Sequence, residues 1–135
     1  MESMKVFISY SEADKKWAHL LRSRLSQEGF ETGNSTNDIA PGDNWLLKSG
    51  KALQTADAMI VLLSPDSAKS DWVRSEIEYA LSSPQFRGRV IPLLVKPTED
   101  IPWILKSLHF IRASKDVDET IDRVAATLQK LPVPA

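Results

Sequence analysis

The segment 58–63 reads Ala58-Met59-Ile60-Val61-Leu62-Leu63, an unbroken apolar run that is followed by Ser64-Pro65-Asp66. An apolar run of strand length is typical of a strand with both faces covered, as in a parallel sheet with helices on each side. Serine, proline and aspartate favour turns, so the strand is expected to end at residue 63. We therefore predict a central strand over 58–63.

Strands and helices are predicted to alternate on both sides of this segment. Further apolar runs predict strands over 5–11, 30–33, 89–95 and 109–113. Apolar residues at helical spacing predict helices between Ser11 and Gly29 and over 45–56, 70–82 and 117–128. In the first helix, Leu20 and Leu21 both belong to the apolar pattern. Alternation of this kind predicts one α/β domain with a parallel sheet and helices on both faces.

Composition excludes several classes of function. The chain has 135 residues, a net charge of −1, two histidines and no cysteine. One domain is therefore expected, without a disulfide, a structural metal site or nucleic-acid binding by this domain alone. We find neither an apolar run long enough to cross a membrane nor a secretory signal, so a cytoplasmic location is expected. The domain is expected to span 1–131, with 132–135 as a tail or the start of a linker.

The predicted helix over 70–82 contains two glutamates in different positions. Ile77 marks its buried face, and Glu78 falls away from that face, where a solvated charge is expected. Glu76 falls on the flank of the buried face, in line with Trp72. Partial burial tends to raise the pKa of a carboxyl group, and carboxyl groups perturbed in this way are often functional. Glu76 is therefore the first candidate for a catalytic residue.

The topology also predicts where a ligand binds. In parallel sheets of this kind, ligands bind beyond the carboxyl ends of the strands. Ser11, the polar segment 34–44 and the start of the helix over 70–82 all fall on that side. The sequence has no glycine-rich phosphate loop and no nucleophile elbow, which argues against the usual nucleotide-binding folds and against a serine hydrolase.

Four segments, in this order, resemble the successive motifs of a TIR (Toll/interleukin-1 receptor) domain. They are Lys5-Val-Phe-Ile-Ser-Tyr-Ser11, Asp38-Ile-Ala-Pro-Gly-Asp-Asn-Trp45, Met59-Ile-Val-Leu-Leu-Ser-Pro65 and Ser70-Asp-Trp-Val-Arg-Ser-Glu76. The resemblance runs from Lys5 to about Leu131 and looks most like bacterial and plant TIR domains. It implies a flavodoxin-like fold, a five-stranded parallel sheet with helices on both faces.

The resemblance also implies an activity. Some TIR domains cleave NAD+ at the nicotinamide–ribose bond and release linear or cyclic ADP-ribose, and the glutamate of their Trp-x-x-x-Glu motif is essential. That glutamate falls on Glu76 in this sequence. NAD+ is then the substrate, and neither a cofactor nor a metal is expected. The alternative is a non-catalytic module that works through TIR–TIR contacts, or a mimic of host signalling.

The remaining candidate residues follow from the same motifs. Residues expected to bind substrate are Tyr10, Ser11, Gly42, Trp45 and Trp72, and residues expected in an assembly loop are Asp38, Ile39 and Pro41. Several of them also have a structural alternative: capping for Ser11, packing for Trp45 and turn formation for Asp38. Many NAD-cleaving relatives carry a basic residue where this chain has Ser11 and Glu12, which weakens the expected complementarity to the pyrophosphate.

The expected setting is a prokaryotic immune effector of the antiphage type. This expectation rests on the family resemblance alone. Its partners would be NAD+, other TIR domains in a homo-oligomer or filament, and a fused or associated sensor domain.

Overall fold

The computed structural model describes residues 4–32, 53–99, 101, 105, 108 and 110–131. These residues form a five-stranded, fully parallel sheet with the strand order β2-β1-β3-β4-β5. The strands are β1 (Lys5–Ser9), β2 (Glu31–Thr32), β3 (Ala58–Leu63), β4 (Val90–Leu94) and β5 (Ile111–Arg112). The predicted flavodoxin-like class is therefore confirmed. Most of the helix predicted over 45–56 lies outside the described residues.

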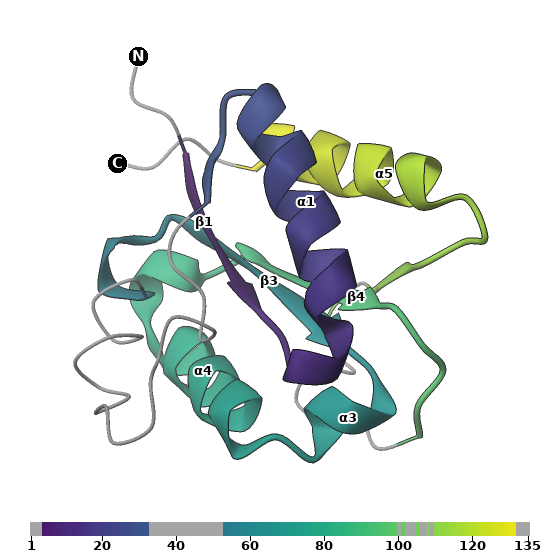
Figure 1. Cartoon of the computed structure of the whole chain (residues 1–135). Helices are drawn as coiled ribbons and strands as arrows, with labels where there is room; N and C mark the ends of the chain where they lie inside the picture. The colour runs from purple at the N-terminus through teal and green to yellow at the C-terminus, as the bar shows by residue number, and fades with distance from the viewer. Residues whose placement is uncertain are drawn as a thin grey trace.

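Helices cover both faces of the sheet (Figure 1). They are the 3-10 turn η1 (Glu12–Asp14), α1 (Lys15–Gln27), α3 (Pro65–Ala68), α4 (Asp71–Ser82), the 3-10 turn η3 (Pro84–Phe86) and α5 (Val117–Gln129). Figure 1 shows α1 and α5 together on one face and α4 on the other. Arg24 of α1 pairs with Asp118 and Asp122 of α5, which links the two helices.

The central strand β3 separates two hydrophobic clusters. Ile60 and Leu62 belong to the cluster under α1 and α5, whereas Met59 and Val61 belong to the cluster under α4. This division follows from the alternation of side chains along a strand. Every residue of β3 is at most 2% exposed, as predicted for a strand covered on both faces.

The ends of the helices agree with local sequence signals. Ser70 caps α4, because its Oγ accepts a hydrogen bond from the backbone N–H of Val73 at 3.3 Å. Asp116 caps α5 in the same way through the N–H of Glu119. Gly29 follows α1 with φ of +92°, a left-handed conformation that glycine adopts without strain. The short helix α3 was not predicted, because its four residues look like a turn in the sequence.

The scaffold differs from what the sequence pattern suggests at two positions. Leu20 does not join the core: it is 48% exposed, whereas Leu21 is fully buried with Ala18 and Leu25. Successive helical residues differ by about 100°, so Leu20 lies beside the narrow buried stripe. Proline cannot donate to a ladder and therefore favours an edge or irregular chain, but Pro92 lies within β4, between β3 and β5. The ladder with β5 begins only at the next residue.

Candidate functional site

Glu76 lies at the carboxyl end of the central strands, where the topology predicts a ligand site. Its Oε1 accepts a hydrogen bond of 2.8 Å from Oγ of Ser9. Ser9 is the last residue of β1, and Glu76 is in the second turn of α4. Both residues are 0% exposed. The pair therefore joins the end of a strand to the helix that covers it.

The sequence explains why these two side chains meet. Ser9 follows Phe7 by two positions, so it points to the α4 face, whereas Ile8 and Tyr10 point to the α1 face. Burying a carboxylate is costly unless it is hydrogen-bonded, and the Ser9 hydroxyl supplies such a bond. Ser9 is not among the site residues predicted from the sequence, although a hydroxyl inside a buried apolar strand indicates a polar contact.

The burial of Glu76 corrects the sequence prediction. A partly desolvated carboxylate on the flank of α4 was expected, but Glu76 belongs to the buried stripe with Val73, Ile77 and Ala80. It occupies a position three residues after Val73 and four before Ala80, which is the spacing of a core face. Glu78 is exposed, as predicted. The two glutamates therefore differ even more than the sequence indicated.

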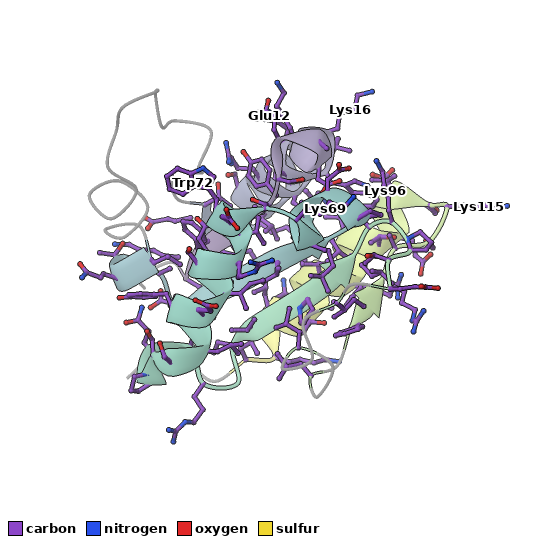
Figure 2. All side chains as sticks on the ribbon, turned by 90° about the horizontal axis from the view of Figure 1, so that it is seen from below. Glu12, Lys16, Lys69, Trp72, Lys96 and Lys115 are labelled. Carbon is purple, nitrogen blue, oxygen red and sulfur yellow. The ribbon has the colours of Figure 1, made fainter. Side chains whose placement is uncertain are left out.

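Trp72 is on the first turn of α4, four residues before Glu76. It is 41% exposed, which is unusual for so large an apolar side chain. Figure 2 views the molecule from below and shows Trp72 on this surface, together with Lys69 and Lys96. Lys69 follows α3 and Lys96 follows β4, and both are exposed. An aromatic face and two cationic groups are therefore accessible at this end of the sheet.

The structure does not bring Tyr10 to Glu76. The Tyr10 side chain is 2% exposed and belongs to the cluster under α1 and α5, on the opposite face of the sheet. It is a core residue, because it alternates with Ser9 at the end of β1.

Ser11 is half-buried, and its Oγ donates to Oδ2 of Asp14 at 3.1 Å. The predicted capping role of the Ser11 side chain is not formed.

The other predicted site residues belong to the segment 38–45. Gly42 and Trp45, expected to bind substrate, and Asp38, Ile39 and Pro41, expected in the assembly loop, lie outside the described residues. Among the residues that the structure describes, no group of three or more His, Cys, Asp or Glu side chains could hold a metal ion.

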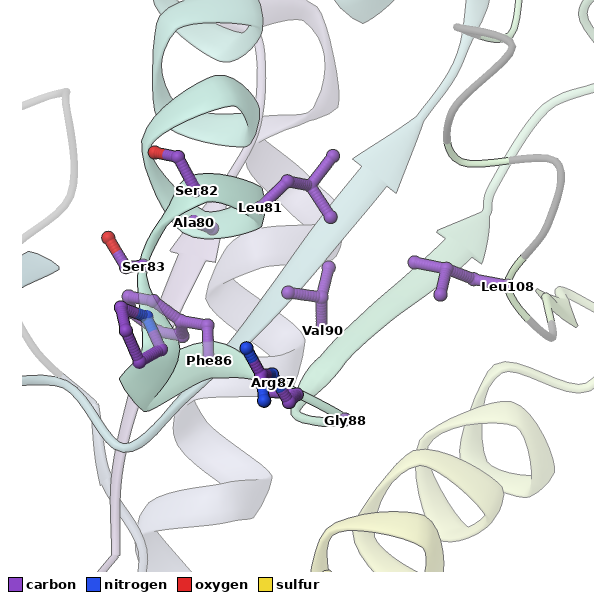
Figure 3. A pocket seen from close by; sticks show the side chains of 10 residues that line it. Ala80, Leu81, Ser82, Ser83, Phe86, Arg87, Gly88, Val90 and Leu108 are labelled. Carbon is purple, nitrogen blue, oxygen red and sulfur yellow. The ribbon is translucent and has the colours of Figure 1, made fainter.

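A separate surface pocket lies near the start of β4 (Figure 3). It has a volume of about 250 Å³ and is lined by residues 80–84 at the end of α4, by Phe86, Arg87 and Gly88, and by Val90 and Leu108. Glu76 is near the carboxyl end of β1, whereas this pocket is at the amino end of β4, a parallel strand. The pocket and the Glu76 site are therefore at opposite ends of the parallel strands.

Ser9→Ala is expected to lower the free energy of unfolding by about 1–3 kcal/mol, because it removes a hydrogen-bond donor from a buried carboxylate. Urea denaturation followed by circular dichroism measures this change. Ser75→Ala is the matched control, since Ser75 is exposed on α4, the helix that carries Glu76, and should change stability by less than about 0.5 kcal/mol. Equal effects of the two substitutions would show that the Ser9 hydrogen bond contributes no stability.

Comparison with protein families gives one match over most of the chain. The family model described as the TIR domain matches residues 6–128. The stimulator of interferon genes protein of Magallana gigas is 27% identical over 125 residues, which cover 89% of this chain and 30% of that protein. The chain thus spans less than a third of this curated relative. In the part of the chain that the structure describes, we find no helix long and apolar enough to cross a membrane.

The chain is also similar to solved structures of TIR domains. The TIR domain of the Toll-related receptor TRR-2 from Hydra magnipapillata has a TM-score of 0.75 and 25% identity, covering 93% of this chain and 98% of that one. A metazoan TIR-STING receptor from C. gigas, solved with 2′,3′-cGAMP, has a TM-score of 0.76 and 25% identity. That match covers 96% of this chain and 40% of the receptor.

Proposed function

Because the chain belongs to the TIR domain family, we propose that it cleaves NAD+ at the nicotinamide–ribose bond and that Glu76 is its catalytic residue. The observation that carries the proposal is the Glu76 carboxylate, fully buried at the end of β1 and hydrogen-bonded to Ser9. An ionisable group is rarely buried in this way, and such groups are concentrated at functional sites.

The chemistry requires one well-placed negative charge. As the glycosidic bond breaks, its electron pair moves to the cationic nicotinamide nitrogen, so nicotinamide leaves as a neutral molecule without a general acid. The ribose becomes an oxocarbenium-like cation, as in glycoside cleavage. Glu76 would stabilise this positive charge. The electrostatic interaction between the two is strongest in a site that excludes water. Water then adds to the ribose to give ADP-ribose, or an internal nucleophile adds to give a cyclic product.

The surface around Glu76 supports binding of a dinucleotide. Trp72 offers an aromatic face on which a ring can stack. Lys69 and Lys96 supply positive charge for the pyrophosphate, which the segment after β1 does not provide through Ser11 or Glu12. Ser11, Gly42 and Trp45 stay in the proposal as substrate-binding residues. Tyr10 is left out, because its ring is in the opposite core.

Substrate reaches Glu76 only when the chain around it rearranges, since its carboxylate is 0% exposed. TIR domains commonly interact with other TIR domains and assemble into oligomers. We therefore assign the rearrangement to self-assembly, with Asp38, Ile39 and Pro41 in the loop that makes the contact. In a prokaryotic immune effector, a fused or associated sensor domain in the cytoplasm would trigger this step. The TIR-STING receptor from C. gigas, in complex with 2′,3′-cGAMP, supports such a pairing of domains.

A non-catalytic interaction module is the second candidate. Glu12 favours it: this acidic residue pairs with Lys15 at 3.2 Å, at a place where a cation would suit the pyrophosphate. The two candidates differ in whether nicotinamide is ever released.

The deciding experiment measures free nicotinamide after incubation of the protein with NAD+. We expect turnover when copies are brought together, at high protein concentration or by fusion to an oligomeric carrier, and little turnover in dilute solution. Chromatography of the products then separates linear from cyclic ADP-ribose. If the carrier-fused protein is folded and still releases no nicotinamide, the interaction module is the correct function.

A further inference from the structure

A second carboxylate is buried at the carboxyl ends of the strands, the same end of the sheet as Glu76. The proposed reaction does not use it. Asp14 is the last residue of η1 and is 2% exposed. Although Asp14 is in the N-cap position of α1, its side chain makes no capping hydrogen bond. A buried carboxylate without a capping task needs another explanation, because its desolvation is costly.

The partners of Asp14 come from two neighbouring strands. Oδ2 of Asp14 accepts hydrogen bonds from Oγ of Ser64 and from Oγ of Ser11, the latter at 3.1 Å. Ser64 directly follows β3, and Ser11 follows β1 by two residues. Since β1 and β3 are adjacent in the sheet, Asp14 fastens their carboxyl ends to each other.

Asp14 also holds the start of α3. Oγ of Ser64 accepts a hydrogen bond from the backbone N–H of Ser67 at 3.1 Å, as the cap of that helix. A hydroxyl group has one proton to donate, and the Ser64 proton goes to Asp14. The Asp14 carboxylate therefore fixes the direction of the Ser64 hydroxyl, which keeps its lone pairs turned toward α3. The contact of η1 with α3 can be followed in Figure 1.

Both ends of the Ser9–Glu76 hydrogen bond are attached to the segments that Asp14 joins. Ser9 is two residues before Ser11, at the end of β1. Helix α3 leads through Ser70 directly into α4, which carries Glu76. From this geometry we infer that Asp14 is a positioning residue, which sets the placement of the Glu76 carboxylate by holding the end of β1 and the start of α3 together.

The inference predicts a specific response of Glu76 to changes at position 14. Asp14→Ala removes the acceptor of both serine hydroxyls, so the Glu76 environment should change. Asp14→Asn keeps one acceptor oxygen of the same shape. Its amide group can take the place of Oδ1, which has no hydrogen-bond partner among the described residues. Asp14→Asn is therefore expected to restore most of the wild-type behaviour.

The first test is independent of any activity. We would record the side-chain carboxyl ¹³C resonances of the whole chain by NMR at constant pH. In Asp14→Ala the Glu76 resonance is expected to move while that of exposed Glu78 stays, and Glu12→Ala, in the same 3-10 turn, should move neither. A Glu76 resonance that stays in place in folded Asp14→Ala overturns the inference. Should Asp14→Ala fail to fold, Ser64→Ala is measured in the same way and with the same criterion.

The second test rests on the proposed function. Asp14→Ala should lower kcat for nicotinamide release on the order of tenfold, with KM within about twofold of wild type, because a misplaced catalytic group affects the transition state most. In a Ser9→Ala background the same substitution should lower kcat by less, since the hydrogen bond between Ser9 and Glu76 is already absent there. Equal losses in both backgrounds mean a general structural role. If wild type releases no nicotinamide, the proposed function fails, and the NMR result alone decides the role of Asp14.

Discussion

Glu76→Gln is expected to lower the rate of nicotinamide release by roughly 10²–10³-fold, the usual cost of losing one preorganised electrostatic group. The amide has nearly the shape of the carboxylate, and its oxygen can still accept the hydrogen bond from Ser9. It carries no charge, however, and so cannot stabilise the oxocarbenium-like ribose. The effect should appear in kcat, measured with carrier-assembled protein at saturating NAD+.

The matched control for this substitution lies on the same helix. Glu78→Gln makes the same chemical change at an exposed position and should leave kcat within about twofold of wild type. Thermal unfolding of both variants shows whether the fold is kept. If folded Glu76→Gln retains wild-type turnover, Glu76 is not the catalytic residue, and the buried carboxylate has to be explained by the fold alone.

Leu21→Ala is expected to lower the free energy of unfolding by about 2–5 kcal/mol, a large part of the stability of a small domain. The Leu21 side chain is 0% exposed and lies between α1 and the sheet, so its truncation leaves a cavity in addition to the lost burial. Urea denaturation at constant pH measures the change. The slope of the unfolding free energy with urea should stay the same if the unfolding remains two-state.

The neighbouring leucine gives the control for the core. Leu20→Ala makes the same truncation one position earlier, where the side chain is 48% exposed, and should cost less than about 1 kcal/mol. Comparable losses at the two positions would show that α1 does not pack on the sheet through the stripe of Ala18, Leu21 and Leu25. The pair therefore tests the orientation of the helix as well as the cost of a cavity.

The parts of the fold that depend on long patterns were predictable from the sequence. Both ends of the strand over 58–63 were predicted correctly, because residues that favour turns directly follow the apolar run. The helix α4 and its cap at Ser70 followed from helical spacing and a serine before the first turn. Leu20 was misplaced because apolar character alone does not fix the rotation of a helix.

The contacts that build the site were not predictable in the same way. Ser9 and Glu76 are 67 positions apart in the sequence, and their hydrogen bond depends on how α4 sits over β1. The same is true of Ser64 and Asp14, which are 50 positions apart. Tyr10 was expected beside the ligand, but it lies in the cluster on the opposite face, and the sequence does not say which face carries the site. Such pairings are properties of tertiary packing, whereas Glu76 became a candidate through its position on the predicted helix and through its motif.

The short outer strands have a consequence for how copies of this domain associate. Within the described residues, β2 and β5 are each two residues long and close the two sides of the sheet. A partner that joins a sheet by strand addition needs a longer row of free backbone donors and acceptors. Along the described parts of β2 and β5, copies are therefore expected to meet through side chains and not by strand addition. Assembly of this kind can be reversed by exchanging single surface residues, which backbone pairing does not allow.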